Sequence, residues 1–585
     1  MKVSDFLVSK IKEHGVDTVF FVNGGGMMHL VDALARDRQI KNVHHHHEQC
    51  AGIAADAYAR VNKNLGVCFA TSGPGGSNLI TAIVGAYQDS SPCLFIVGQS
   101  KSSETISNSG INPRQIGTFE VNLIPIVSSI CKYAVTVSSA NEIPEVLKKA
   151  IEKAKSGRPG PSVIEIPLNI QGGIISEFRD KLDKYKSQTI QSSTKNQEQI
   201  FLNSLTNDLK KSKKPCLLIG KGVTIANCNN EILQLAQRFS LPIVTTQFGK
   251  DCVDNDSLNF IGHCGPKGTR AGNFAIHHAD LILSLGCSLH GQTIGWEENL
   301  FAQKAKFYRT DIDKQCLLNK KTFVDYSLQI SVEDMLKLLK KTKVNVDASN
   351  WLYECQSFLE KNRIETEKFR RIKKSINAYD VMFALNESFD SDEIFIADAG
   401  SSFYVTGQAL QLNHKQSFIS SASLGAMGYA LPAASGAAAA APDRKIICIT
   451  GDGSLMSNPS ELSVAKYNNY NILYIILNNG GYVSMRNTQQ AFFEGRRIGA
   501  DISSGVMIPS LKKTAELYKI NYLKINCLTD LTKFFSSNQL PCEPLLLDVK
   551  CNFEQEIIPT VKSQRLDDGT MISGHLHPMF PFDEK

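Results

Sequence analysis

Short apolar strands alternate with helical stretches in three successive blocks, and this alternation constrains the fold more than any other feature of the sequence. Strands separated by helices form parallel sheets, because a parallel connection needs a crossover long enough to hold a helix. The sequence therefore predicts an α/β protein with three doubly wound parallel-sheet domains. Ligands of such sheets bind at the carboxyl ends of the strands, so functional residues are expected in the loops that follow them.

The domain boundaries follow from where the alternation stops. A chain of 585 residues is long enough for several domains. We expect three domains at 1–174, 199–342 and 377–555, a polar linker at 175–198, a charged helical linker at 343–376, and a tail at 556–585. The expected strands lie at 18–22, 66–70, 93–97 and 162–166, at 215–219, 242–245, 281–285 and 306–310, and at 393–397, 445–450, 473–477 and 545–549.

Composition excludes some classes of protein. The net charge of +6 comes from 63 basic and 57 acidic residues and is too weak a bias to indicate a nucleic-acid partner. No stretch resembles a signal peptide or reaches the length of about 18 apolar residues that a membrane span needs. The 15 cysteines are scattered without a CxxC pair, which favours reduced thiols in a cytoplasmic protein.

Polar residues follow two strands of the third block. The strand at 445–450 ends in Gly451-Asp452-Gly453-Ser454, and the strand at 473–477 ends in Asn478-Asn479. Parallel strands end at the same edge of a sheet, which brings Asp452 and Asn479 together. Mg²⁺ prefers oxygen ligands and shares its shell with phosphate oxygens. Asp452, Asn479 and a backbone carbonyl near Gly481 are therefore predicted to hold Mg²⁺ with a diphosphate.

The residues around this pair suit a phosphate group. Gly453 allows the backbone to approach the phosphates, and the helix start after Ser454 offers free N–H groups to an anion. Either motif alone would be an ordinary turn. The spacing of 24 residues between Gly453 and Asn478 resembles the signature of thiamine diphosphate (ThDP) enzymes.

Further stretches resemble the acetolactate synthase-like branch of these enzymes, in order along nearly the whole chain. They are HEQCAGIAADAYAR (47–60), FATSGPGGSNLITAI (69–83), SSPCLFIVGQ (90–99), RPGPSVIEIPLNIQ (158–171) and SLGAMGYALPAA (423–434). The resemblance implies that the domains are the pyrimidine, central and diphosphate domains of a ThDP enzyme. It also implies a homodimer or a dimer of dimers with active sites shared between chains.

The resemblance implies roles for individual residues. Glu48 relays a proton to the cofactor's aminopyrimidine ring, Met427 is the apolar wedge that holds the cofactor bent, and Gly24 and Gly25 lie at the substrate end of the site. The implied diphosphate-binding residues are Ser401, Ser402, Gly451, Gly453 and Ser454, and the implied metal ligands are Asp452, Asn479 and Gly481.

The sequence departs from this family at two positions near the substrate. Asn23 stands where Pro is usual, and Phe119 replaces a usual Gln near the reacting carbons, which puts substrate handling in doubt. The paired histidines of the pyruvate decarboxylase branch are absent from residues 100–119. Carbon–carbon bond formation is therefore favoured over simple release of an aldehyde.

The resemblance implies decarboxylation of a 2-oxo acid such as pyruvate and transfer of the resulting carbanion to a carbonyl acceptor. The tail, with Gly569-Thr570-Met571 and Met579-Phe580-Pro581-Phe582, resembles that of acetolactate synthase-like proteins found with surface-polysaccharide genes, where it can fold over the active site. A keto sugar nucleotide is thus one expected acceptor. Two alternatives stay open: a non-ligating decarboxylase of a substituted pyruvate, and a non-catalytic subunit with this fold.

Two features of the sequence have alternative explanations. The second block has glycine turns after strands at 220–222 and 286–288, and its glycine-rich stretch at 261–273 lies where the family approaches FAD. Any doubly wound domain needs glycine turns after strands, so FAD stays open. The run His44–His47 suggests a metal, although adjacent strand residues alternate faces and cannot all ligate one ion. Packing in a loop next to the cofactor is the preferred interpretation of this run.

Overall fold

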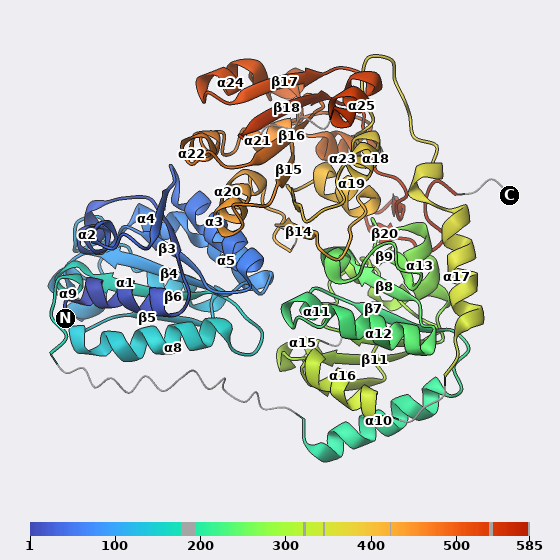
Figure 1. The fold of residues 1–585 in the computed structure, drawn as a ribbon, viewed down its shortest axis with the longest axis horizontal. Helices are drawn as coiled ribbons and strands as arrows, with labels where there is room; N and C mark the ends of the chain where they lie inside the picture. Colours follow the sequence, from blue (N-terminus) through green and yellow to red (C-terminus); the bar gives the residue numbers. More distant parts are fainter. Residues whose placement is uncertain (177–192, 320–322, 343–345, 422, 538–541, 583–585) are drawn as a thin grey trace.

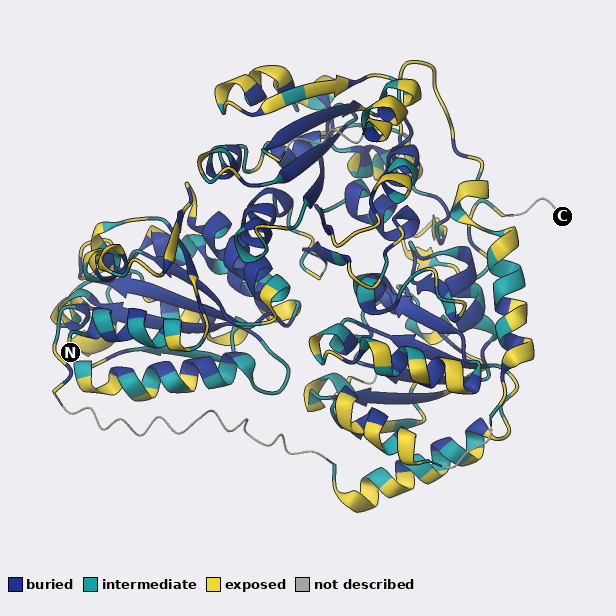
Figure 2. Cartoon of the chain, viewed as in Figure 1, coloured by how far each residue is buried: buried dark blue, intermediate teal, exposed yellow. Residues whose placement is uncertain are grey.

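The computed structural model describes all residues except 177–192, 320–322, 343–345, 422, 538–541 and 583–585. It contains three six-stranded parallel sheets, each covered by helices on both faces (Figure 1). Figure 2 shows that burial concentrates in these sheets and in the helix faces turned toward them. The predicted fold class is confirmed.

The first domain carries its sheet in the order β2-β1-β3-β4-β6-β5. Its strands are β1 (Thr18–Phe21), β2 (Lys41–His44), β3 (Gly66–Ala70), β4 (Cys93–Gln99), β5 (Tyr133–Thr136) and β6 (Ser162–Pro167). Its helices are α1 (Val3–Glu13), α2 (Met28–Arg36), α3 (Glu48–Asn62), α4 (Pro74–Asn78), α5 (Ile80–Gln88), α6 (Ile106–Ser109), α7 (Leu123–Val127), α8 (Ile143–Lys155) and α9 (Leu168–Gln171).

The central domain has the order β12-β11-β10-β7-β8-β9. Its strands are β7 (Pro215–Ile219), β8 (Ile243–Thr246), β9 (Phe260–Cys264), β10 (Leu281–Leu285), β11 (Lys306–Asp311) and β12 (Tyr326–Gln329). Its helices are α10 (Lys195–Leu209), α11 (Gly222–Ile225), α12 (Asn229–Phe239), α13 (Arg270–His278), α14 (Gly291–Ile294), α15 (Lys314–Leu318) and α16 (Val332–Lys341).

The third domain has the order β14-β13-β15-β16-β18-β17. Its strands are β13 (Ile394–Ala397), β14 (Ser417–Ser420), β15 (Ile446–Gly451), β16 (Ile472–Asn478), β17 (Asn521–Ile525) and β18 (Leu545–Lys550). Its helices are α18 (Ala378–Ser388), α19 (Ser401–Ala409), α20 (Ala430–Ala440), α21 (Asp452–Leu455), α22 (Glu461–Tyr467), α23 (Val483–Phe492), α24 (Leu511–Leu517) and α25 (Leu528–Ser536).

The first and third domains pack together through α3 and α20. Both helices are rich in small residues, which lets their backbones come close. A Cβ built on Gly436 would lie 2.0 Å from the carbonyl oxygen of Ala54, so this position accepts only glycine. The hydroxyl of Tyr429 donates to Asp56 across the interface at 2.9 Å. The Ala-rich run at 433–441 is thus largely a packed helix, as expected from the sequence.

The connecting segments agree in part with expectation. The charged linker contains α17 (Ser349–Lys361), which runs alongside the central domain in Figure 1. Most of the expected linker at 175–198 lies outside the described residues, and α10 begins within its last part, at Lys195.

The tail packs on the central domain. It forms a hairpin of β19 (Ser563–Arg565) and β20 (Met571–Ser573). The Arg270 guanidinium in α13 donates to the carbonyl oxygens of Met579 (2.9 Å) and Pro581 (2.7 Å) and forms an ion pair with Glu367. Among the described residues, no helix is long and apolar enough to cross a membrane. All fifteen cysteines are free.

Candidate active site

Asp452 joins the two strand-end motifs of the third domain. It begins α21 directly after β15, and one carboxylate oxygen accepts hydrogen bonds from the backbone of Gly480 (2.7 Å) and Gly481 (3.1 Å), just after β16. Its other oxygen accepts from Gly453 N at 2.9 Å. The side chain is fully buried, and burial raises its pKa to about 6. The predicted meeting of the two motifs at one sheet edge is confirmed.

The residues at this edge fit a divalent cation. Asp452 is a buried carboxylate, and no ion pair to it is found in the described part of the chain. The buried Asn479 supplies an amide oxygen, and no hydrogen bond to the carbonyl of the buried Gly481 is found among the described residues. Oxygen donors of these three kinds suit Mg²⁺. No group of three or more His, Cys, Asp or Glu that could hold a metal occurs among the described residues, so the donor set is the one carboxylate with amide and carbonyl oxygens.

The predicted diphosphate residues lie at neighbouring strand ends. Ser401 and Ser402 begin α19, which follows β13, and Ser454 lies in α21, which follows β15. The Ser402 hydroxyl donates to the carbonyl oxygens of Asp398 (3.2 Å) and Ala399 (2.9 Å), so this side chain supports the turn. A Cβ on Gly453 would lie 2.4 Å from the Tyr482 ring, so this glycine is needed for the close approach of the two loops.

Met427 lies in a turn that Asp398 holds. Met427 is 46% exposed, and the backbone that follows it is fixed because the Asp398 carboxylate accepts from Gly428 N and Ala430 N, both at 3.0 Å. Burial raises the pKa of Asp398, and its hydrogen bonds oppose this shift. The sequence analysis missed Asp398. Its position directly after the predicted strand at 393–397 was the available signal.

In the first domain, the loop and short helix after β3 connect the predicted site residues. A Cβ on Gly24 would lie 2.6 Å from Thr71, and one on Gly73 would lie 2.3 Å from the Phe119 carbonyl oxygen. Asn78, at the end of α4, donates to Glu48 Oε2 at 2.9 Å. Gly24, Phe119 and Glu48 thus lie around residues 71–78, at the carboxyl end of β3.

The predicted site residues of the first domain differ in how exposed they are. A Cβ on Gly25 would meet open space, whereas Gly24 is required for packing on Thr71. Phe119 is 71% exposed and has a left-handed backbone with φ of 59°, a conformation unfavourable for a bulky residue. Glu48 is buried at the first turn of α3. Their roles toward the substrate stay predictions.

The four consecutive histidines bind three different segments. His44 Nε2 accepts from Asn23 N at 3.3 Å, in the loop before Gly24, and His47 caps α3 by accepting from Gln49 N. His45 is fully buried, with Nδ1 2.7 Å from Glu461 Oε2, and His46 Nε2 lies 2.9 Å from Ser463 Oγ. The last two contacts tie the segment that precedes Glu48 to α22 of the third domain. This arrangement supports the packing interpretation of the run.

The glycines that suggested FAD are explained by packing within the central domain. A Cβ on Gly220 would lie 2.4 Å from the carbonyl oxygen of Gly286, and one on Gly222 would lie 2.7 Å from its Cα. A Cβ on Gly262 would lie 2.1 Å from Thr269 Oγ1. Packing within the domain therefore accounts for these glycines without a flavin.

Comparison with known proteins agrees with this geometry. Three domain families match: "Thiamine pyrophosphate enzyme, N-terminal TPP binding domain" at residues 1–115, its central domain at 202–339 and its C-terminal TPP binding domain at 398–549. The probable acetolactate synthase large subunit of Methanocaldococcus jannaschii is 30% identical over 94% of this chain and 92% of its own length. The chloroplastic acetolactate synthase of Arabidopsis thaliana is 30% identical (96% and 83%), and the isozyme 1 large subunit of Escherichia coli is 31% identical (84% and 84%).

One matched family falls in each of the three sheet domains, and the first and last are described as TPP binding. The likeness to acetolactate synthases extends through all three domains. The chain belongs to the thiamine diphosphate enzymes and is an acetolactate synthase-like member of that family.

Proposed function

We propose that the protein uses ThDP and Mg²⁺ to decarboxylate a 2-oxo acid, pyruvate in the simplest case, and transfers the resulting two-carbon unit to a carbonyl acceptor. The observation that carries the proposal is the buried Asp452 carboxylate, which joins the strand ends of β15 and β16 without a cationic side chain in ion-pair contact among the described residues. A buried carboxylate is costly unless it is paired or coordinates a metal. Mg²⁺ bound to a diphosphate would supply the missing charge.

Different residues of the chain would bind the metal and the diphosphate. Asp452, Asn479 and the Gly481 carbonyl would hold the metal, and the backbone at Gly451, Gly453 and Ser454 would hold the diphosphate. Once bound, ThDP supplies a carbon nucleophile that takes up the 2-oxo acid and stabilises the negative charge left by loss of CO₂. Burial of the metal ligands excludes water from the ion and strengthens their electrostatic hold on it.

Glu48 would hold and move the proton that the cofactor ring needs. Asn78 fixes its Oε2, and no hydrogen bond to Oε1 is found in the described part of the chain. That oxygen is available to a ring nitrogen. The His45–Glu461 and His47–Gln49 contacts on the preceding segment limit the movement of Glu48.

The geometry of α3 supports active sites shared between two chains. Tyr429, two residues after Met427, contacts Asp56, and the segment before Met427 contacts Arg60 through the carbonyl oxygen of Ser420. Asp56 lies eight residues along α3 from Glu48, which is about 12 Å at 1.5 Å per residue. Met427 therefore lies toward the far end of α3 from the Glu48 of its own chain, as expected if the two act on one cofactor from different subunits.

Phe119 favours a specialised acceptor. Its exposed ring offers apolar area and a π face, where a Gln would offer hydrogen bonds. A keto sugar carried on a nucleotide has such a ring-shaped part, whereas a second pyruvate does not. The second candidate function is non-ligating decarboxylation of a substituted pyruvate, which the same ring could accommodate.

Product analysis tests the proposal. The protein is incubated with ThDP, Mg²⁺ and pyruvate, with and without a carbonyl acceptor, while CO₂ and product masses are recorded. The proposal expects CO₂ that depends on both cofactors and a product that contains the acceptor. Release of free aldehyde alone would favour the second candidate, and absence of CO₂ with every 2-oxo acid tested would refute both.

Subunit mixing tests the shared site. Glu48→Gln and Asp452→Ala proteins are each expected to be inactive. After subunit exchange, random dimers should regain about a quarter of the sites, because one of the two sites in each mixed dimer is intact. Lack of recovery despite proven exchange would show that each chain builds its own site.

A further inference from the structure

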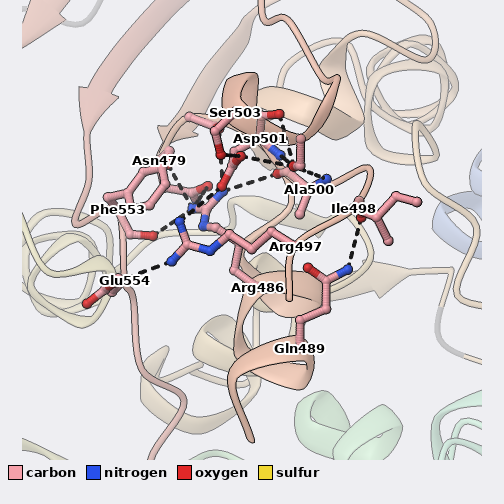
Figure 3. A network of polar contacts seen from close by, with 12 residues as sticks. Asn479, Arg486, Gln489, Arg497, Ile498, Ala500, Asp501, Ser503, Phe553 and Glu554 are labelled. Atoms are coloured by element: carbon pink, nitrogen blue, oxygen red, sulfur yellow. Dashed lines mark hydrogen bonds and ion pairs between the residues drawn. The ribbon is translucent and has the colours of Figure 1, made fainter. Parts of the chain in front are cut away.

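Behind the predicted metal ligands lies a buried arginine that no motif of the sequence indicated. Arg486 lies in the first turn of α23, seven residues after Asn479, and is 2% exposed. Figure 3 shows its guanidinium within a group of polar contacts between the metal-binding loop, residues 479–481, and the segments at 497–503 and 553–554.

Arg486 binds the acceptors of the metal-binding loop. Its Nη2 donates to the Asn479 carbonyl oxygen at 2.9 Å and lies 3.4 Å from Asn479 Oδ1, and its Nη1 donates to the Gly480 carbonyl oxygen at 3.4 Å. The backbone N–H groups of Gly480 and Gly481 in the same loop donate to the Asp452 carboxylate. The loop is thus held from both sides, by a carboxylate on its N–H groups and by a guanidinium on its oxygens.

The guanidinium is itself fixed by atoms outside the loop. It donates to the carbonyl oxygens of Phe553 (2.6 Å) and Ala500 (3.3 Å), and it lies 4.0 Å from the centre of the Phe553 ring. No carboxylate lies within ion-pair distance of it among the described residues. The planar guanidinium of an arginine has five N–H donors in fixed directions and can bind several acceptors at once. The ammonium of a lysine has no such fixed geometry.

We propose that Arg486 is a positioning residue that sets Asn479 and the two following residues in the orientation that binds the divalent cation. The amide oxygen of Asn479 has two lone pairs. Arg486 Nη2 lies 3.4 Å from this oxygen and engages one lone pair, which leaves the other for the cation. Arg486 touches neither substrate nor metal in this arrangement, and it acts through Asn479. The inference rests on the proposed Mg²⁺ and ThDP dependence.

Arg497 provides a matched control. It belongs to the same network, with Nη1 3.3 Å from Asp501 and Nη2 3.6 Å from Glu554, and it lies 5.3 Å from the centre of the Phe553 ring. No contact from it to residues 479–481 is found in the described part of the chain. A variant at Arg497 therefore perturbs the charge and packing of the network without releasing the loop.

The experiment measures the Mg²⁺ concentration that half-saturates ThDP binding, followed by fluorescence or circular dichroism at fixed ThDP, for wild type, Arg486→Lys, Arg486→Met and Arg497→Met. Changes in groups that orient metal ligands typically weaken metal binding about 10- to 100-fold. Arg486→Lys should raise the half-saturating Mg²⁺ by about this factor, with turnover restored at saturating Mg²⁺ and a single cooperative thermal transition that shows the apoprotein to be folded. Arg497→Met should match wild type.

The outcomes separate this inference from the proposed function. If wild type binds ThDP in an Mg²⁺-dependent way and the folded Arg486→Lys protein needs no more Mg²⁺, the positioning role is refuted alone. An equal Mg²⁺ shift in Arg497→Met would refute it as well, since the network would then act only through general packing. If wild type shows no Mg²⁺-dependent ThDP binding, the proposed function falls, and this inference with it. The lysine variant keeps the test decisive if Arg486→Met does not fold.

Discussion

Replacing Glu165 by Gln should stabilise the first domain at neutral and alkaline pH but not at acidic pH. Glu165 lies in β6 and is 4% exposed, and burial raises the pKa of its carboxyl from 4.5 to about 7. Its Oε1 accepts from Gln99 Nε2 at 2.8 Å and its Oε2 from Thr136 Oγ1 at 2.7 Å. A glutamine keeps the shape, accepts from Gln99 and can donate to the Thr136 hydroxyl.

The magnitude follows from linkage. The folded protein holds a proton on Glu165 that the unfolded chain releases between pH 4.5 and 7, so wild-type stability falls as pH rises through this window. A difference of roughly 2.5 pKa units corresponds to about 3 kcal/mol at 1.36 kcal/mol per unit. For a domain of this size, that is roughly 6–12 °C in melting temperature. The advantage of the variant should be near zero at about pH 4.5 and complete at about pH 8.

The assay is the melting temperature of the apoprotein between about pH 4.5 and 8, taken as the difference between variant and wild type so that other titrating groups cancel. The exposed Glu145→Gln, which removes a carboxylate from the surface of the same domain, is the control. A Glu165→Gln difference that is constant across this range would refute the assigned titration. A variant that loses stability at the alkaline end would show that the charged carboxylate is the form the fold favours.

Four further changes test the site and the tail. Glu48→Gln should lower turnover by about 10²- to 10⁴-fold while equilibrium dialysis shows ThDP still bound; near-full activity would contradict the proton relay. Asp452→Ala should fail to retain ThDP on gel filtration even in excess Mg²⁺, and tight retention would refute the metal site. Phe119→Gln should raise acetolactate formation from pyruvate and lower activity on the native acceptor, because an unmet polar group costs about 1–3 kcal/mol; no change in either product would leave Phe119 as a space-filling residue. Arg270→Ala should free the tail for limited proteolysis, since breaking a buried ion pair costs about 3–5 kcal/mol, and an uncut tail would contradict its anchoring role.

The sequence predicted the centre of each sheet and missed its edges. All twelve expected strands were found, with ends that shift by at most two residues, and each sheet carries two more: β2 and β5, β9 and β12, β14 and β17. Each of these is an edge strand. Edge strands face solvent on one side and need fewer apolar residues, as in β2 and β17, which bury one residue each. In β9, Gly262 and His263 interrupt the apolar run that would have marked it.

Strand ends predicted part of the candidate site. Asp452 and Asn479 were named because each follows a predicted strand, whereas Ser401 was named only from the family resemblance and Asp398 was missed although it follows a strand directly. Arg486 and Asn78 were not predicted, since both lie in helices and neither follows a strand directly; Asn78 meets Glu48 only after two segments of the first domain come together.

The two side chains that hold the predicted metal-binding loop, Asp452 and Arg486, come from different parts of the fold. Asp452 is bound to the loop because β15 and β16 are adjacent, a relation that any doubly wound sheet of this order provides. Arg486 reaches the same loop from α23, and its guanidinium is fixed by Ala500 and Phe553, which belong to segments after α23 and after β18. The oxygens of the loop are therefore set by contacts that strand order does not determine. If Mg²⁺ affinity varies among proteins of this fold, the difference should lie in the contacts that Arg486 makes, since the contact of Asp452 with the loop is imposed by strand order.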